Sequence, residues 1–273
     1  MVTTAKSVLD RTNPAAYLRS ALKHNQFVLY CQPAASLKRS VALPMAEIFV
    51  RLREEENALL PPGDFLPVLQ TLGMMPELDR WVLRETIKQG LKAPAIKSFC
   101  LNVGRETIED DKFPQFVARE ISCAGIPPER LTFEVSEADA GASVVAGRRF
   151  ADALRRIGVR LAIQDFRCGK ASLSVFRLLR ANFAKIDGSL VRKMRHSPAA
   201  RSVVAAAARA IASVGAETIA EQVEDQETLA VVQELGLDYA QGFGIFIPAP
   251  IHTILGSADS RIGHSAALAQ PRF

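Results

Sequence analysis

Ten polar residues interrupt apolar segments of this sequence that read as buried strands. They are Gln32, Glu47, Asn102, Glu134, Gln164, Asp165, Lys185, Asp187, Glu221 and Gln241. We expect each to lie toward the C-terminal end of its strand, where barrel enzymes place their active sites. Carboxylates that converge there repel one another unless a cation neutralises them. The pattern therefore predicts a site for a hard divalent cation such as Mg²⁺, Mn²⁺ or Ca²⁺.

The stretch LAIQDFRCGKASL, residues 161–173, has an unusual strand end because the amide of Gln164 stands beside the carboxylate of Asp165. Taken singly, such a residue is as compatible with an ion pair in a loop as with a ligand of a functional site. Lys185 with Asp187 is likewise compatible with a structural pair. The repetition of polar strand ends along the chain favours one shared site. Whether that site is a complete metal centre or has lost a member depends on Gln164.

The elements that would position these residues alternate between strand and helix. Strand-like segments are FVLYCQP, LPMAEIFVRL, SFCLNVG, LTFEVSE, VRLAIQDF, FAKID, ETIAEQV and DYAQGF, with helical patterns between most of them. About eight strands of this kind predict an α/β fold, a TIM-like (β/α)8 barrel. No helix separates the first two strands, which predicts a hairpin and one antiparallel strand. We assign residues 1–12 to a lead, 13–250 to the barrel and 251–273 to a partly disordered tail.

Composition narrows the class of protein. The chain has 273 residues, 48% of them hydrophobic and 23% charged, which supplies a core of the size that a barrel needs. The net charge of +5 comes without a basic run that alternates with aromatic residues, so we expect no DNA or RNA partner. Four widely spaced cysteines argue against a zinc site and indicate free thiols. Without a signal-peptide pattern, we expect a cytoplasmic chain with no membrane insertion.

Motifs on these strands resemble those of the EAL family of cyclic di-GMP phosphodiesterases. EIFVR, which begins at Glu47, resembles the motif that names the family, and CLNVG, FEVSE, FAKID, AEQVE and AQGF follow in the family's order. The resemblance extends over about residues 13–250. It implies a barrel that acts in bacterial second-messenger signalling. It also implies two Mg²⁺ or Mn²⁺ ions that activate a water to open cyclic di-GMP to linear pGpG.

The resemblance also implies roles for individual positions. Glu47 and Lys185 are the catalytic candidates, with Lys185 positioning or deprotonating the water. The metal-ligand positions are Glu47, Asn102, Glu134, Asp165 and Glu221. The positions that would contact guanine and phosphate are Gln32, Phe49, Arg51, Asp187, Glu224, Gln241 and Phe243. Arg51 suits this role because a guanidinium pairs well with a phosphodiester.

The sequence departs from the family at its catalytic centre. Members carry two aspartates and then a Phe-Gly-Thr-Gly loop, whereas this chain has Gln164 in place of the first aspartate and the loop FRCGK. That aspartate is expected to bridge the two metals, and a neutral amide removes one negative charge between them. We expect one weak Mg²⁺ or Mn²⁺ site in place of two, or none.

These departures predict a degenerate EAL domain that acts as a non-catalytic or weakly catalytic cyclic di-GMP signalling module. Such a module would bind cyclic di-GMP, a protein partner, or both. The alternative is an active metal-dependent phosphodiesterase in which Gln164 or a water replaces the bridge. A third interpretation is a protein-interaction barrel that binds no nucleotide. Family members often dimerise through a helix and the loop after the aspartate pair, which keeps a homodimer among the expected assemblies.

Overall fold

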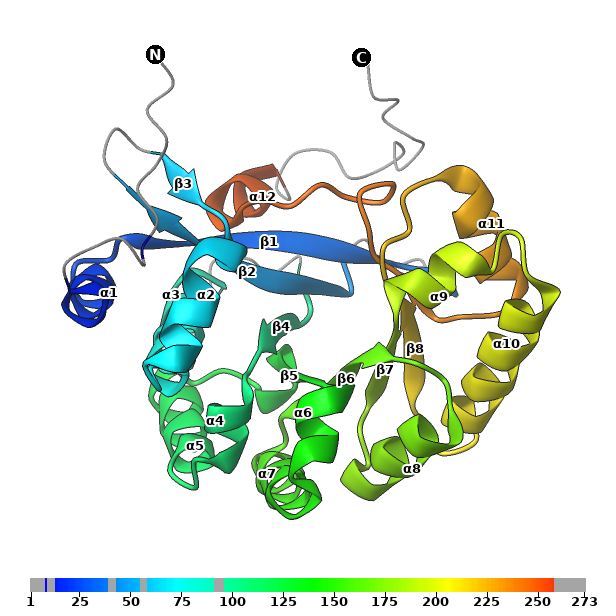
Figure 1. Cartoon of the computed structure of the whole chain (residues 1–273), viewed down its shortest axis with the longest axis horizontal. Coiled ribbons are helices and arrows are strands. Elements are labelled where there is room, and N and C mark those ends of the chain that lie inside the picture. Colours follow the sequence, from blue (N-terminus) through cyan, green and yellow to red (C-terminus); the bar gives the residue numbers. More distant parts are fainter. Residues whose placement is uncertain (1–7, 9–12, 39–42, 55–57, 91–95, 258–273) are drawn as a thin grey trace.

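Eight strands close into a barrel in this computed structural model, because the first of them pairs with both the second and the last. Figure 1 shows the chain, of which the structure describes residues 8, 13–38, 43–54, 58–90 and 96–257. The barrel strands are β1 (Phe27–Ser36), β2 (Met45–Arg53), β4 (Phe99–Asn102), β5 (Leu131–Ser136), β6 (Arg160–Phe166), β7 (Phe183–Ile186), β8 (Glu217–Ala220) and β9 (Tyr239–Ala240). β2 and β4 to β9 run parallel in chain order, and β1 closes the ring antiparallel to β2 and β9. The predicted TIM-like barrel with one antiparallel strand is confirmed.

The predicted hairpin joins β1 and β2 over almost their whole length. Their register pairs Phe27 with Leu52 at one end and Ala34 with Met45 at the other. Two short strands extend this pair outside the ring: β3 (Leu59–Leu60) is antiparallel to β2, and β10 (Ala249–Pro250) is antiparallel to β1. The hairpin therefore projects beyond the barrel.

Helices lie around the outside of the strands (Figure 1). They are α1 (Pro14–Lys23), α2 (Pro62–Thr71), α3 (Met75–Gly90), α4 (Arg105–Glu109), α5 (Phe113–Ala124), α6 (Glu137–Ala142), α7 (Val144–Ile157), α8 (Lys170–Leu179), α9 (Gly188–Lys193), α10 (Pro198–Ala212), α11 (Gln226–Glu234) and α12 (Ile251–Ser257), with a 3-10 turn at Pro128–Arg130. No helix in the described ranges is long and apolar enough to span a membrane.

The structure describes only part of the predicted lead and of the predicted tail. α12 follows the barrel within the predicted tail, and residues 258–273 lie outside the described part. The same holds for all of the predicted lead except Val8, which is buried. The predicted barrel segment begins with α1, where the side chain of Asn13 accepts a hydrogen bond from the backbone N–H of Ala16 at 3.0 Å.

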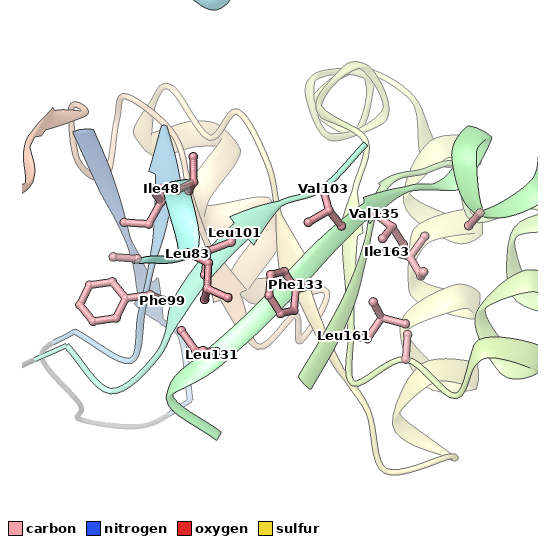
Figure 2. Close-up of a cluster of buried hydrophobic side chains, with 14 of the residues drawn as sticks. Ile48, Leu83, Phe99, Leu101, Val103, Leu131, Phe133, Val135, Leu161 and Ile163 are labelled. Carbon is pink, nitrogen blue, oxygen red and sulfur yellow. The ribbon is translucent and has the colours of Figure 1, made fainter. Parts of the chain in front are cut away.

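Two buried layers hold the barrel together. Side chains alternate along each strand, so one set fills the barrel and the next faces the helices. The inner set consists of Ala34, Met45, Cys100, Ala162, Phe183, Ile219 and Tyr239. Figure 2 shows part of the outer set, in which Leu101, Phe133, Val135 and Ile163 come from neighbouring strands and Leu83 from α3. All four cysteines are free, as predicted, and three of them are buried.

The prediction that every polar residue lies toward the C-terminal end of its strand is wrong for Gln32 and Glu47. Gln32 lies in the middle of β1, and Glu47 is the third residue of the nine-residue β2. The reason is the projecting hairpin, since β2 continues past the barrel rim and β1 runs in the opposite direction. The two residues face each other in the β1–β2 register, which still brings them to the same level of the barrel.

Asp79 of α3 is a buried acid that fastens the segment after β4. Its Oδ2 accepts hydrogen bonds from the Thr107 hydroxyl at 2.6 Å and the Gly104 backbone N–H at 3.3 Å. Burial raises the pKa of Asp79 to about 7, against the two hydrogen bonds, which lower it. The folded chain therefore keeps this proton up to about pH 7, whereas the unfolded chain releases it near the ordinary value of 3.8.

We expect Asp79→Asn to become more stable relative to the wild type as the pH rises. Between the two pKa values of Asp79, the wild type loses roughly 1.4 kcal/mol of unfolding free energy per pH unit, and the loss levels off above the folded-state value. The substituted amide has no such cost, and its oxygen can still accept both hydrogen bonds. Urea unfolding of both proteins from about pH 5 to about pH 8 measures the difference. If the unfolding free energies of the two proteins changed with pH in parallel, the raised pKa of Asp79 would be contradicted.

Candidate functional site

Lys185 of β7 lies at the centre of the acidic residues predicted to share a site. Its Nζ is 2.6 Å from Glu134 on β5, 2.7 Å from Glu47 on β2 and 3.3 Å from Glu221, which follows β8. The lysine side chain is 1% exposed, and that of Glu134 is also 1% exposed. The barrel thus brings residues from four separate strand segments, spread over positions 47–221, around one buried ammonium group.

Amide side chains complete the surroundings of Glu47. Asn102 and Gln241 each donate a hydrogen bond to one of its carboxylate oxygens at 2.8 Å. Gln241 also donates to Gln32 at 3.2 Å, and Gln32 donates to the backbone carbonyl of Phe246 at 2.6 Å. Seven candidates, Gln32, Glu47, Asn102, Glu134, Lys185, Glu221 and Gln241, therefore form one connected network.

The charges in this network are strongly coupled. Burial opposes ionisation of Glu47, but the Lys185 ammonium and three hydrogen bonds outweigh it, so the pKa of Glu47 is lowered. Burial and the Glu47 charge raise the pKa of Glu134 to about 8. Burial raises the pKa of Glu221 to about 7, although Lys185 opposes this. Burial would lower the pKa of Lys185, but Glu134, Glu47 and Glu221 together raise it well above its ordinary value.

Gln164 and Asp165 occupy an irregular strand end. The pairing of β6 with β7 shifts between Ile163 and Phe166, and Asp165 adopts a left-handed backbone with φ of 55°. Gln164 is half-buried opposite Ser136, while Asp165 is exposed. Burial of part of its carboxyl group and the nearby charge of Asp187 raise the pKa of Asp165. The irregularity explains how two adjacent residues of one strand can both be polar.

Glu137 holds the FRCGK loop and was missed by the sequence analysis. One of its carboxylate oxygens accepts a hydrogen bond from the Arg167 backbone N–H at 3.0 Å, and the other accepts one from the Ser172 hydroxyl at 2.8 Å. Cys168 lies between them, buried and left-handed with φ of 62°. Glu137 is the last residue of FEVSE, so the motif contained the signal, but only its first glutamate was assigned a role.

The remaining candidates lie outside the network. Arg51 donates to the Val50 carbonyl at 3.0 Å, and its guanidinium stacks 5.5 Å from the ring centre of Tyr30, a residue that the sequence analysis also missed. Phe49 is paired with Tyr30 in the β1–β2 register and is half-buried. Together these side chains give the projecting hairpin a cationic and aromatic surface of the kind that binds nucleotides.

The other three predicted ligand contacts lie on separate segments. Asp187 caps α9 by accepting hydrogen bonds from the backbone N–H groups of Ser189 and Leu190 at 3.0 and 3.2 Å. Glu224 and Phe243 are both exposed. Gly242, the residue before Phe243, lies against Val223, the residue before Glu224. A Cβ atom at Gly242 would be 2.3 Å from backbone atoms of Val223. Glycine is therefore required for the two segments to approach this closely.

The donor chemistry of the network fits one hard divalent cation. Carboxylate oxygens of Glu47, Glu134 and Glu221 already converge on a positive charge, the Lys185 ammonium. Oxygen ligands of this kind are the ones that Mg²⁺ and Mn²⁺ prefer. Within the described residues, no three acidic, histidine or cysteine side chains are already arranged as a metal cage. An ion would therefore compete with Lys185 for the carboxylates.

Comparison with known proteins identifies relatives over the whole barrel. The family described as EAL domain matches residues 15–248. Cyclic di-GMP phosphodiesterase PdeF of Escherichia coli strain K12 is 31% identical over 258 residues, which cover 93% of this chain and 34% of PdeF. Cyclic di-GMP phosphodiesterase PdeB of Shewanella oneidensis is 27% identical over 255 residues, 92% of this chain and 30% of PdeB. The chain spans about a third of the length of these curated relatives.

A solved structure agrees with the family match. The EAL domain of FimX from Pseudomonas aeruginosa, in a crystal structure bound to c-di-GMP, superimposes with a TM-score of 0.80 at 26% identity. The superposition covers 86% of this chain and 95% of that one. Because the match extends from α1 to the loop after β9 and the barrel is shared, the chain belongs to the EAL domain family.

Proposed function

We propose that this EAL domain is a cyclic di-GMP receptor that hydrolyses its ligand weakly or not at all. The observation that carries the proposal is Gln164, a neutral residue at the irregular end of β6 where the family has the first of two aspartates. An amide lacks the charge that would hold two divalent cations close together. Without a second ion, the attacking and the leaving oxygen would no longer both be stabilised by a cation.

Binding requires fewer groups than hydrolysis, and the chain keeps residues that we assign to binding. Gln32 and Gln241 belong to the buried network, Asp187 caps α9 directly after β7, and Phe49 and Arg51 lie on the projecting hairpin. Phe243 is 66% exposed and is free to contact a base. The structure of the FimX EAL domain, with the same fold, contains c-di-GMP. These features support a receptor for the same dinucleotide.

EAL phosphodiesterases generally depend on divalent metals, and we propose that this domain keeps one weak Mg²⁺ or Mn²⁺ site. Its ligands would be Glu47, Asn102, Glu134, Asp165 and Glu221. A divalent cation, when bound, lowers the pKa of a coordinated water and so supplies a nucleophile. The chain's own part is to orient the phosphodiester through Arg51 and to hold a positive charge at Lys185, beside the carboxylates.

Arg51→Ala is expected to weaken cyclic di-GMP binding about tenfold or more, because a charge-assisted pair with a phosphate is worth roughly 1.5–3 kcal/mol. Isothermal titration calorimetry in Ca²⁺, with the substituted and unsubstituted chains, measures the change. Arg53→Ala is the matched control, since Arg53 is an exposed arginine on the same strand and should leave the affinity unchanged. Equal losses in both variants would show that the effect is one of net charge only.

The alternative function is an active phosphodiesterase. It is favoured by the intact cluster of Glu47, Asn102, Glu134, Lys185 and Glu221, and by the names of PdeF and PdeB. It requires pGpG release that depends on Mg²⁺ or Mn²⁺ and disappears in Glu47→Ala. The third interpretation, a barrel that binds only protein partners, requires no heat on titration with cyclic di-GMP. A protein partner and a homodimer stay predictions that light scattering and partner titration can test.

A further inference from the structure

A hollow lies at the end of the barrel opposite the acidic network. Its volume is about 290 Å³, and its lining includes Arg155 of α7, Arg160 at the start of β6, Arg180 at the end of α8 and Asn182 just before β7. Gln164 is four residues farther along β6, or roughly 13 Å at the usual rise per residue. A ligand in this hollow would therefore not overlap with one at the acidic network.

Among the residues that the structure describes, those that line the hollow include cations but no acidic side chain. Three arginines line it, and its other lining residues are apolar residues, a glycine and Asn182. Arg155 is fixed in place, since it donates to Asp152 at 2.6 Å and to the Leu179 carbonyl at 2.7 Å. Asp152 itself lies outside the lining. The hollow thus has an excess of positive charge that the protein only partly balances.

Arg160 and Arg180 form no side-chain hydrogen bond or ion pair in the described part of the chain, and they supply the free donors. Arg180 follows α8 with φ of 50°, a left-handed backbone that costs an ordinary residue roughly 1–2 kcal/mol. The dipole at the end of α8 would attract a cation at residue 180. It does not account for Arg160, which begins a strand.

Asn182 adds neutral donors to the same hollow. Its Oδ1 accepts a hydrogen bond from the backbone N–H of Leu161 at 3.0 Å, which orients the amide and leaves its NH₂ group for a ligand. Guanidinium and amide N–H groups around a small cavity are complementary to the oxygens of a phosphate. A volume of about 290 Å³ accommodates one or two phosphate groups with water.

We propose that this hollow, formed by Arg155, Arg160, Arg180 and Asn182, is a second ligand site that binds a phosphate or pyrophosphate group. The group belongs either to a small soluble molecule or to a lipid headgroup. The site is independent of the cyclic di-GMP site proposed above, because the two lie at opposite ends of the barrel.

The test is titration calorimetry of the full chain with pyrophosphate, without divalent cations. We expect saturable binding at one site, weakened about tenfold by Arg160→Gln and by Arg180→Asn, because each removes a charged donor. These two arginines are chosen because their side chains have no hydrogen-bonded partner in the described chain, so their loss should leave the fold intact. Asparagine also tolerates the left-handed backbone at residue 180. Thermal unfolding of each variant checks the fold.

Two controls separate the hollow from general attraction to a basic chain. Arg177→Gln removes an exposed arginine one turn earlier on α8, outside the lining, and Arg53→Ala removes an exposed arginine of β2, on the projecting hairpin. Both should bind pyrophosphate as the wild type does. Absence of binding, an equal loss in Arg177→Gln, or a loss in Arg53→Ala would overturn the proposal.

Vesicles of phosphatidylcholine with and without phosphatidic acid distinguish the two sources of the phosphate. Cosedimentation with the phosphatidic acid vesicles that is lost in Arg160→Gln and Arg180→Asn, but kept in Arg177→Gln, assigns the site to a lipid headgroup. Pyrophosphate binding with no cosedimentation assigns it to a soluble phosphate compound. Cosedimentation that is insensitive to Arg160 and Arg180, with no pyrophosphate binding, would overturn the site.

Discussion

Gln164→Asp is expected to raise the rate of pGpG release from cyclic di-GMP by about 100-fold or more, equivalent to a barrier lower by roughly 2.7 kcal/mol. The substitution restores a carboxylate beside Asp165, on the strand end that is irregular and partly exposed. A charged bridge allows a second divalent cation to approach the first, which the neutral amide does not. The cluster around Lys185 is already assembled, so no other element has to be built.

Chromatographic separation of pGpG from cyclic di-GMP, in Mg²⁺ and in Mn²⁺, measures this rate. Gln164→Asn is the matched control, because it has the length of aspartate but no charge. Activity in the aspartate variant only would show that the missing charge limits hydrolysis. Failure of Gln164→Asp to gain activity would contradict the prediction and would shift the cause to Arg167 and Cys168 in the loop that Glu137 holds.

Lys185→Met is expected to reduce the free energy of unfolding by roughly 3–5 kcal/mol when no divalent cation is present, the usual cost of removing one partner from a buried ion pair. Lys185 carries the ammonium that Glu47, Glu134 and Glu221 share, and methionine keeps most of its length without its charge. The carboxylates would then have to take up protons or remain buried without a counterion. Urea unfolding of the variant and the wild type measures the loss.

The double variant Lys185→Met with Glu134→Gln tests the cause. Because Glu134 is the most deeply buried of the three acids, its neutralisation should recover part of the lost stability. Mg²⁺ should also stabilise Lys185→Met more than it stabilises the wild type, since the ion no longer competes with the ammonium. A loss that neither change relieves would mean that Lys185 acts through packing of its side chain, and the ion-pair account would fail.

The sequence predicted the barrel because its signals are local. The apolar runs, the helical patterns between them and the missing helix between β1 and β2 each depend on a few neighbouring residues. Most of the acidic network was also predictable, because polar residues inside apolar strands have few other uses. Seven of the ten residues predicted to share a site belong to it, whereas Gln164, Asp165 and Asp187 do not. Its centre was not predictable, since the position of Lys185 among three carboxylates depends on the closure of the whole barrel.

Other features of the site depend on three-dimensional contacts that the sequence does not carry. The irregular end of β6 arises from its pairing with β7, and the anchoring of the FRCGK loop arises from Glu137 on a different helix. The level of Glu47 was wrongly predicted because the length by which β2 passes the rim is set by its pairing with β1 and β3. Pairing between distant segments is the common cause.

The most direct test of the receptor proposal is titration of the full chain with cyclic di-GMP in Mg²⁺, followed by recovery and chromatography of the nucleotide. The account predicts saturable heat, and it predicts that the recovered nucleotide is still cyclic di-GMP. Recovery of linear pGpG at a turnover of roughly 1 s⁻¹ or faster would contradict it, since that rate belongs to an ordinary enzyme. Absence of heat would equally contradict it, because a receptor must bind its ligand.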